Sequence, residues 1–312
     1  MRVAGGGWLN LVLYKCEPDI LRKILAANRV ADFLAGQGLP VRRTHDQRIL
    51  QMKSGNFVKF AALYNYLPGR TIPWEAYTKR HIKNLGAMLG AMHQALQRLP
   101  RLGEGVADEY LGILARMERY FADPNVQSAL RQKLALAAPQ DFSRQRRLLH
   151  LCQKLPGQHM LHMDFVRSNI LFDEGGGIAG IIDFEKTAWG HPLFDIARTL
   201  AFLLVDCKYK TESQVRQYFL ISGYARRNHQ TFKNLVIHSD GGRIDILEEL
   251  VNLLLLYDFY KFLRHNPYES LLYNEHFVRT RTALIARHQL CDASPDDSSA
   301  KIEHQNKGYQ RP

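Results

Sequence analysis

Three polar residues near the middle of the chain have the types and the spacing needed to hold a metal-bound phosphate beside a hydroxyl group. Asp164 and Asn169 lie five positions apart, and Asp183 follows an apolar run further along the chain. A carboxylate can accept the proton of a hydroxyl that is otherwise a poor nucleophile. Mg²⁺ prefers oxygen ligands, which aspartate and asparagine side chains supply. The three residues therefore predict phosphoryl transfer, a reaction that depends on positioning and charge neutralisation.

The neighbouring residues predict the element that positions this group. Residues 170–172 and 178–184 are short apolar runs separated by the glycine-rich segment 173–177, a pattern typical of a β-hairpin. Such a hairpin would deliver the loop of Asn169 and the side chain of Asp183 to one edge of a cleft. Protein kinases use the same layout, an H-x-D-x-x-x-x-N loop followed by a metal-binding aspartate.

The stretch from His162 to Leu204 resembles the core of the aminoglycoside phosphotransferase and choline kinase superfamily. This resemblance implies an α+β, protein-kinase-like fold with a small strand-rich N-terminal lobe and a large, mainly helical C-terminal lobe. It also implies that Asp164 is the catalytic base, that Asn169 and Asp183 bind the metal, and that His162 orders the catalytic loop.

Two further residues are given supporting roles. Asp195 matches the buried aspartate with which the family holds the backbone of the catalytic loop, and a carboxylate there would also suit the N-terminus of a helix. His93 lies beside an apolar stripe with helical spacing and is interpreted as a structural residue.

Nucleotide-binding residues are expected upstream of this core. The segment from Leu63 to Gly69 resembles the strand and hinge on which the family seats adenine, so the backbone groups of Asn65 and Leu67 are expected to face the purine. The alternative is a strand that ends at a Pro-Gly turn. Gly6 and Gly7 stand where a glycine-rich loop over the phosphates is expected, but so few residues precede them that the first strand must be very short or absent.

The phosphate-binding cation can be placed in two registers. In the preferred one, residues 9–16 form the second strand and residues 20–23 the third, with Arg22 facing phosphate. In the other, residues 11–15 form the third strand and Lys15 is the cation.

The helix expected around residues 26–35 departs from the family pattern. Kinase-fold enzymes normally hold the cation with a glutamate on this helix, and here the corresponding positions carry no acid. Asp32 is the only acid in the segment and lies about one helical turn too late. Either the ion pair is rebuilt differently, or this lobe positions phosphates less well than the family norm.

Length and composition fit one kinase-like unit, because 312 residues of which 46% are hydrophobic can bury a sizeable core. Residues 1–70 are expected to form the ATP-binding lobe, residues 71–290 the helical lobe with the catalytic loop, and residues 291–312 a disordered tail. Helical patterns occupy residues 76–98, 108–121, 125–137, 141–155, 192–206, 211–226, 243–264 and 270–289.

Charge and cysteine content limit which partners and which cellular compartment are expected. The net charge of +12 attracts phosphate-bearing partners such as ATP. The basic residues are dispersed in short groups, for example Arg42-Arg43 and Arg226-Arg227, which are interpreted as solvated, so nucleic acid is not expected as a partner. Four scattered cysteines and the lack of a long apolar segment predict a cytoplasmic protein without a membrane span. The oligomeric state stays open.

The sequence thus predicts an ATP- and Mg²⁺-dependent phosphotransferase that acts on a hydroxyl group of a small molecule. One alternative is a catalytically silent, kinase-like nucleotide-binding module, which the missing helix glutamate favours and the intact Asp164, Asn169 and Asp183 oppose. A nucleic-acid-associated kinase is a weaker alternative, motivated by charge alone. Because the helical lobe lacks a dense acidic cluster, the acceptor is predicted to be a neutral or zwitterionic alcohol.

Overall fold

The computed structural model describes residues 7–55, 57–229, 238–239, 242–243 and 245–292. Gly6 and nearly all of the expected tail lie outside these residues. The chain divides into two compact units, Met1–Leu114 with Ser143–Leu255 and Ala115–Phe142 with Leu256–Pro312. Every described candidate site residue lies in the first unit.

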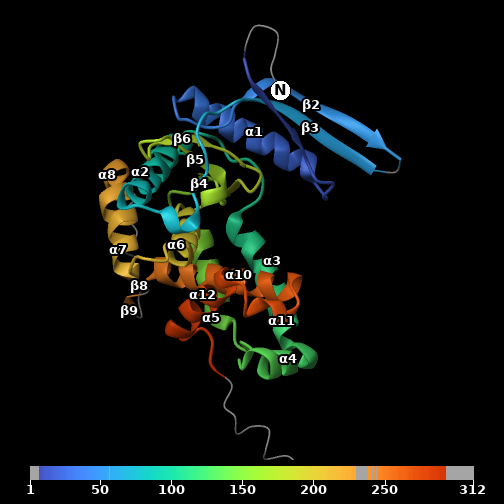
Figure 1. The fold of residues 1–312 in the computed structure, drawn as a ribbon, viewed down its shortest axis with the longest axis vertical. Coiled ribbons are helices and arrows are strands. Elements are labelled where there is room, and N and C mark those ends of the chain that lie inside the picture. The colour runs from blue at the N-terminus through green and yellow to red at the C-terminus, as the bar shows by residue number, and fades with distance from the viewer. Residues whose placement is uncertain (1–6, 56, 230–237, 240–241, 244, 293–312) are drawn as a thin grey trace, which may run out of the picture. The chain divides into compact units, whose positions relative to one another are not determined.

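The first unit begins with a three-stranded antiparallel sheet and one helix. Strands β1 (Leu9–Leu13), β2 (Thr44–Ser54) and β3 (Phe57–Asn65) pair in the order β1-β3-β2. Helix α1 (Ile20–Gly36) runs alongside the sheet (Figure 1). Apolar side chains recur along α1 at helical spacing and bury one face of it; the residues buried between α1 and the sheet include Tyr14, Ile24, Ala62 and Tyr64.

The preferred register of the N-terminal lobe is wrong. Residues 20–23 form the first turn of α1 and not a strand, so Arg22 lies on a helix, where its exposed side chain pairs with Glu104 at 3.1 Å. Asp19 ends the preceding turn in the left-handed region, with a φ of 57°, which reverses the chain into the helix. Lys15 lies two residues beyond the end of β1 and is exposed. Neither cation is therefore presented by a strand.

Helices make up most of the remaining first unit. Helix α2 begins at a capping box in which the Thr78 hydroxyl accepts a hydrogen bond from the His81 N–H while the His81 ring accepts from the Thr78 N–H. The helical elements of this part are η1 (Trp74–Ala76), α2 (Lys79–Leu96), α3 (Val106–Ala122), α5 (Ser143–Lys154), α6 (Leu193–Asp206), α7 (Glu212–Arg216), η3 (Gln217–Tyr224), α8 (Ala225–Arg227) and α10 (Ile246–His265). Helices α3 and α10 continue past Leu114 and Leu255 into the second unit. Strands β8 (His238–Ser239) and β9 (Gly242–Arg243) form a small pair before α10.

The second unit contains α4 (Pro124–Leu134), α11 (Tyr268–Leu271) and α12 (Glu275–Ala286). All the predicted helical segments are occupied by helix, although residues 270–289 are divided between α11 and α12. None of the described helices is long and apolar enough to cross a membrane.

Two short antiparallel pairs carry the catalytic region. The predicted hairpin is formed by β5 (Ile170–Phe172) and β6 (Ile178–Ile181), and its turn is closed by a hydrogen bond from the Gly177 N–H to the Asp173 carboxylate at 2.7 Å. The second pair, β4 (His159–Leu161) with β7 (Ala188–Gly190), was not predicted. The catalytic loop leaves β4, and its turn η2 (Arg167–Asn169) leads directly into β5.

The hairpin is joined by backbone hydrogen bonds to two segments of the N-terminal lobe, one before β2 and one after β3. After α1, the Arg42 N–H donates to the Ile181 carbonyl at 2.8 Å and the Ile181 N–H donates to the Pro40 carbonyl at 2.9 Å. After β3, Arg70 and Phe172 exchange two backbone hydrogen bonds, of 3.0 and 2.9 Å. Gly69 permits the second approach: its φ is 98°, and a Cβ there would lie 2.9 Å from the Phe172 carbonyl oxygen.

Candidate active site

The catalytic loop brings Asp164 and Asn169 into direct contact. Both side chains are buried. The amide nitrogen of Asn169 donates to the Asp164 carboxylate oxygen Oδ2 and to the Asp164 backbone carbonyl, each at 2.9 Å. These two bonds fix the amide so that its nitrogen faces Asp164. Its oxygen accepts a hydrogen bond from the Ser168 hydroxyl at 3.3 Å and keeps a second lone pair for another group.

Lys186 occupies the other carboxylate oxygen of Asp164. Its ammonium lies 2.8 Å from Oδ1, and its side chain is 61% exposed. The pair is therefore open to solvent on the lysine side, so the ammonium can move into water when an acceptor hydroxyl binds Asp164. Nothing in the sequence identified Lys186, which lies on a different loop from Asp164.

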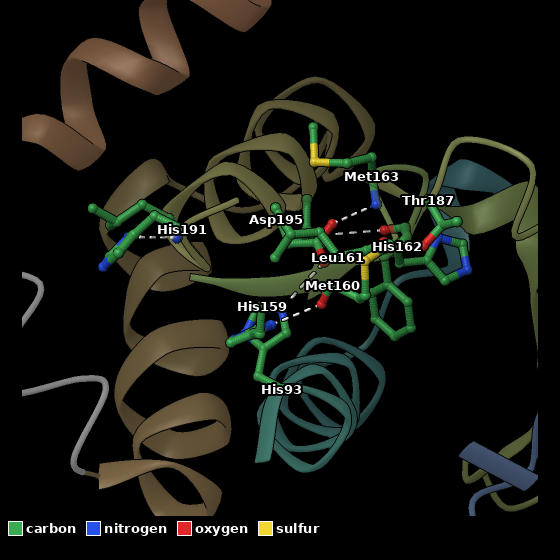
Figure 2. A network of polar contacts seen from close by, with 12 residues as sticks. His93, His159, Met160, Leu161, His162, Met163, Thr187, His191 and Asp195 are labelled. Atoms are coloured by element: carbon green, nitrogen blue, oxygen red, sulfur yellow. Dashed lines mark hydrogen bonds and ion pairs between the residues drawn. The ribbon is translucent and has the colours of Figure 1, made fainter. Parts of the chain in front are cut away.

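Asp195, near the start of α6, holds the backbone that leads into the loop (Figure 2). Its two carboxylate oxygens accept hydrogen bonds from the backbone N–H groups of His162 and Met163, at 2.8 and 2.6 Å. Burial alone would raise the pKa of Asp195, but the hydrogen bond with His93 and those from the backbone hold it below its usual value. Met163 is kept at a φ of 60°, in the left-handed region, a strained conformation that these bonds stabilise.

His93 and His162 support the same loop from the core. The His93 Nε2 lies 3.1 Å from an Asp195 oxygen, and its Nδ1 lies 2.8 Å from the Tyr224 hydroxyl. The ring of His93, on α2, therefore connects Tyr224 of η3 to Asp195. His162 is fully buried, and its Nδ1 accepts a hydrogen bond from the Asp164 N–H at 3.2 Å. Burial lowers the pKa of His162.

His159 and His191 are two other buried histidines near this network (Figure 2). Because of them, we expect the protein to lose stability in mild acid. Burial and the nearby His93 lower their pKa values to about 3 and about 4. An unfolded histidine titrates near about 6.5, so below that pH the unfolded state binds protons that the folded state does not. Each histidine should therefore reduce the free energy of unfolding by up to about 1.4 kcal/mol per pH unit as the pH falls from about 6.5 towards about 4.

Urea unfolding at several pH values between 7 and 4.5 measures this slope. His159→Asn keeps a donor for the Met160 carbonyl, which the His159 Nδ1 contacts at 2.7 Å, and removes the titration. It should flatten the slope by up to about 1.4 kcal/mol per pH unit, the share of one histidine, because His191 and His162, whose pKa values burial also lowers, remain. His150→Asn, at an exposed position of α5, is the matched control and should leave the slope unchanged. Equal slopes in the His159 variant and the unaltered protein would contradict the assignment.

Asp183 and Glu185 follow β6 and form a closely coupled pair of carboxyl groups. The hydrogen bond with Glu185, then burial and the negative charges of Glu185 and Asp164, raise the pKa of Asp183 to about 7. Burial opposes ionisation of Glu185, but the hydrogen bond with Asp183 and the guanidinium of Arg42 outweigh it and lower its pKa to about 2. Asp183 itself is held at a φ of 62°. The opposite shifts are those of two neighbouring carboxyl groups that resist ionising together.

The donor set fits a magnesium ion. Asp183 offers a carboxylate, and Asn169 offers an amide oxygen that accepts one hydrogen bond, from Ser168, while its nitrogen is held by Asp164. Mg²⁺ is usually bound by one or two such side chains together with phosphate oxygens and water. The residues present therefore suit this ion.

The N-terminal candidates are placed less favourably. Asn65 ends β3, and its backbone N–H already donates to the Arg43 carbonyl at 3.0 Å, so its carbonyl is the group left for a ligand. Leu67 lies against Gly180 of β6, beside the strand that leads to Asp183. Gly7 is exposed, just before β1. The solvated role predicted for Arg42 is wrong, because its side chain is only 7% exposed and pairs with Glu185 at 2.7 Å.

Comparisons with known proteins identify a family for most of the chain. A model of the phosphotransferase enzyme family matches residues 2–226. Homoserine kinases from strains of Pseudomonas aeruginosa are 32% identical over 175 residues, which make up 54% of this chain and 50% of theirs. The chain thus spans about half the length of the curated relatives that it matches.

Two solved structures share the fold. An amicoumacin kinase in complex with AMP-PNP and Ca²⁺ has a TM-score of 0.66 at 16% identity, covering 94% of this chain and 85% of its own. A microcompartment-associated aminopropanol kinase has a TM-score of 0.61 at 16% identity, covering 92% and 89%. At this identity the likeness concerns the fold alone, and it confirms the two-lobed, kinase-like α+β architecture.

Proposed function

The chain belongs to the phosphotransferase enzyme family, and from this premise we propose that it transfers the terminal phosphoryl group of ATP, bound with Mg²⁺, to a hydroxyl group of a small molecule. The observation that carries the proposal is the contact between Asn169 and Asp164, which aims the amide oxygen of one residue and leaves the carboxylate of the other to accept a proton. The catalytically silent alternative is not favoured, because these groups are intact.

In this proposal each residue acts through one atom or group. The Asp164 carboxylate accepts the proton of the acceptor hydroxyl as that oxygen attacks the terminal phosphorus of ATP and the bond from this phosphorus to ADP breaks. Asp183 and the Asn169 oxygen would hold the metal, which would supply positive charge to the phosphates. Asp195 and His162 keep the loop in place through the backbone bonds at His162, Met163 and Asp164. Fixed positions matter because phosphoryl transfer depends on alignment.

The acceptor proposed is a small neutral or zwitterionic hydroxy compound. The relatives and structural neighbours include homoserine kinases and an aminopropanol kinase, whose named substrates carry one hydroxyl and few charges. The chain has a net charge of +12, which repels a polycation at long range. Lys186 adds a positive charge beside Asp164, where an acceptor hydroxyl would bind.

A phosphorylation screen tests the proposal and the acceptor class together. ATP consumption is measured with homoserine, amino alcohols, sugars and a kanamycin-type aminoglycoside, each at low and at physiological ionic strength, with Asp164→Asn as the background. We expect turnover with one or more small hydroxy compounds and a kcat/KM at least about tenfold lower for the aminoglycoside at low salt, where repulsion is least screened. Efficient phosphorylation of the aminoglycoside alone would contradict the acceptor class, and turnover that Asp164→Asn leaves unchanged would contradict the mechanism.

A further inference from the structure

Arg42 is a buried cation beside the candidate metal site. It follows α1, and its guanidinium donates to the Glu185 carboxylate at 2.7 Å, with only 7% of the arginine and 16% of the glutamate side chain exposed. The guanidinium also lies 4.1 Å from the centroid of the Tyr64 ring, which it stacks against. A charge this deeply buried is stable only with a well-placed partner, and Glu185 is that partner.

The backbone holds Arg42 beside the strand that leads to Asp183. Val41 forms a parallel bridge with Ile181, and the Arg42 N–H donates to the Ile181 carbonyl at 2.8 Å. Ile181 is the last residue of β6, two positions before Asp183. Arg42 therefore reaches the metal loop twice, through its backbone to Ile181 and through its side chain to Glu185.

In the N-terminal lobe, neutral residues stand where kinase-fold enzymes carry an ion pair between a strand and the first helix. In kinase-fold enzymes, a cation on the strand before the first helix pairs with a glutamate on that helix. Here the strand before α1 leads into Tyr14, whose hydroxyl lies 2.5 Å from that of Tyr64, and Tyr64 donates to the buried Asn28 of α1 at 2.8 Å. This neutral chain links strand to helix without a charge, and Arg42 lies against the same tyrosine.

Building on the function proposed above, we propose that Arg42 is the positioning residue of the nucleotide site: through its buried ion pair with Glu185 it fixes the loop that carries Asp183. The Arg42–Glu185 pair thus fixes the metal loop to the segment after α1, whereas the strand cation and helix glutamate of kinase-fold enzymes join a strand to a helix. Its loss would leave Glu185 as an uncompensated carboxylate in contact with Asp183, and the Asp183 side chain would lose its fixed orientation. The consequence should appear in the magnesium requirement for nucleotide binding.

The test compares Arg42→Gln, Arg42→Lys, Glu185→Gln and the double variant Arg42→Gln/Glu185→Gln with the unaltered protein. Binding of a fluorescent ATP analogue is followed while Mg²⁺ is titrated, and the unfolding temperature reports on folding. Arg48→Gln is the matched control, because it removes an exposed arginine of β2 that pairs with Asp46.

We expect Arg42→Gln to raise the midpoint of the Mg²⁺ titration by about 10- to 100-fold, because Glu185 loses the partner that holds the Asp183 loop in place, and this loss of positioning outweighs the removal of a positive charge near the ion. Arg42→Lys should recover part of this shift, since lysine keeps the charge but not the planar fork of arginine. The double variant should shift the midpoint no further than Arg42→Gln alone, since both substitutions break the same ion pair. The Arg48→Gln midpoint should not move.

Several outcomes would overturn the inference or separate it from the proposed function. A folded Arg42→Gln variant with an unchanged Mg²⁺ midpoint would show a purely structural role and overturn it. If Arg42→Gln does not fold, Glu185→Gln decides: an unchanged midpoint there also overturns it, and a raised midpoint supports it. Asp183→Ala is titrated with Mg²⁺ in parallel. If its Mg²⁺ midpoint shifts and those of the Arg42 variants do not, this inference alone is overturned. If no midpoint shifts in either, the metal site itself is overturned.

Discussion

Asp164→Asn should lower kcat by on the order of 10² to 10⁴ while the affinity for the magnesium–nucleotide complex stays nearly unchanged. In the unaltered protein the Asn169 amide nitrogen lies 2.9 Å from the Asp164 carboxylate. The oxygen of an asparagine at position 164 can still accept this hydrogen bond, so the loop should keep its shape. What is lost is the capacity to accept a proton from the acceptor hydroxyl. The effect should therefore fall on turnover and not on nucleotide binding.

The measurement pairs single-turnover kinetics with nucleotide titration, using the acceptor found in the screen. Glu174→Gln neutralises an exposed carboxylate in the turn between β5 and β6 and serves as the control. Full activity in Asp164→Asn would remove the assignment of Asp164 as base. An equal loss of nucleotide affinity and turnover would indicate instead that the loop had been displaced.

Asp183→Ala should abolish phosphoryl transfer and raise the Mg²⁺ concentration needed for nucleotide binding by at least about 100-fold, because it removes the one carboxylate assigned to the ion. It also leaves Glu185 with Arg42 as its main partner, at 2.7 Å, so that ion pair and the fold should survive. The unfolding temperature should therefore change little.

Nucleotide binding across a Mg²⁺ titration, alongside turnover at saturating Mg²⁺, checks the second prediction. Glu174→Ala is the matched control, since it removes a carboxylate from the same hairpin at an exposed position. A magnesium titration in Asp183→Ala that superimposes on that of the unaltered protein would contradict the role of Asp183 as a metal ligand.

The catalytic loop and its hairpin were predictable because the residues that form them lie close together in the sequence. Asp164 and Asn169 are held by contacts within one short loop, and β5 and β6 are joined by a glycine-rich turn, so spacing along the chain translates directly into geometry. The helices were likewise predictable from apolar periodicity.

Contacts between distant segments could not be predicted in the same way. Arg42 and Glu185 are 143 positions apart, and nothing in the motif around either residue indicates the other. The first turn of α1 was mistaken for a strand because four residues, Ile20 to Lys23, are too few to distinguish the two periodicities, and the family pattern favoured a strand there. Strands β4 and β7, of three residues each, are too short to leave a pattern.

The two attachments of the β5–β6 hairpin consist of backbone groups alone. One is at Ile181, through Arg42 and Pro40, and the other is at Phe172, through Arg70. Backbone hydrogen bonds are made whatever side chain a residue carries. Substitutions at Arg42 or Arg70 should therefore leave the hairpin attached, so a change in Mg²⁺ binding on replacing Arg42 would come from the loss of its side chain.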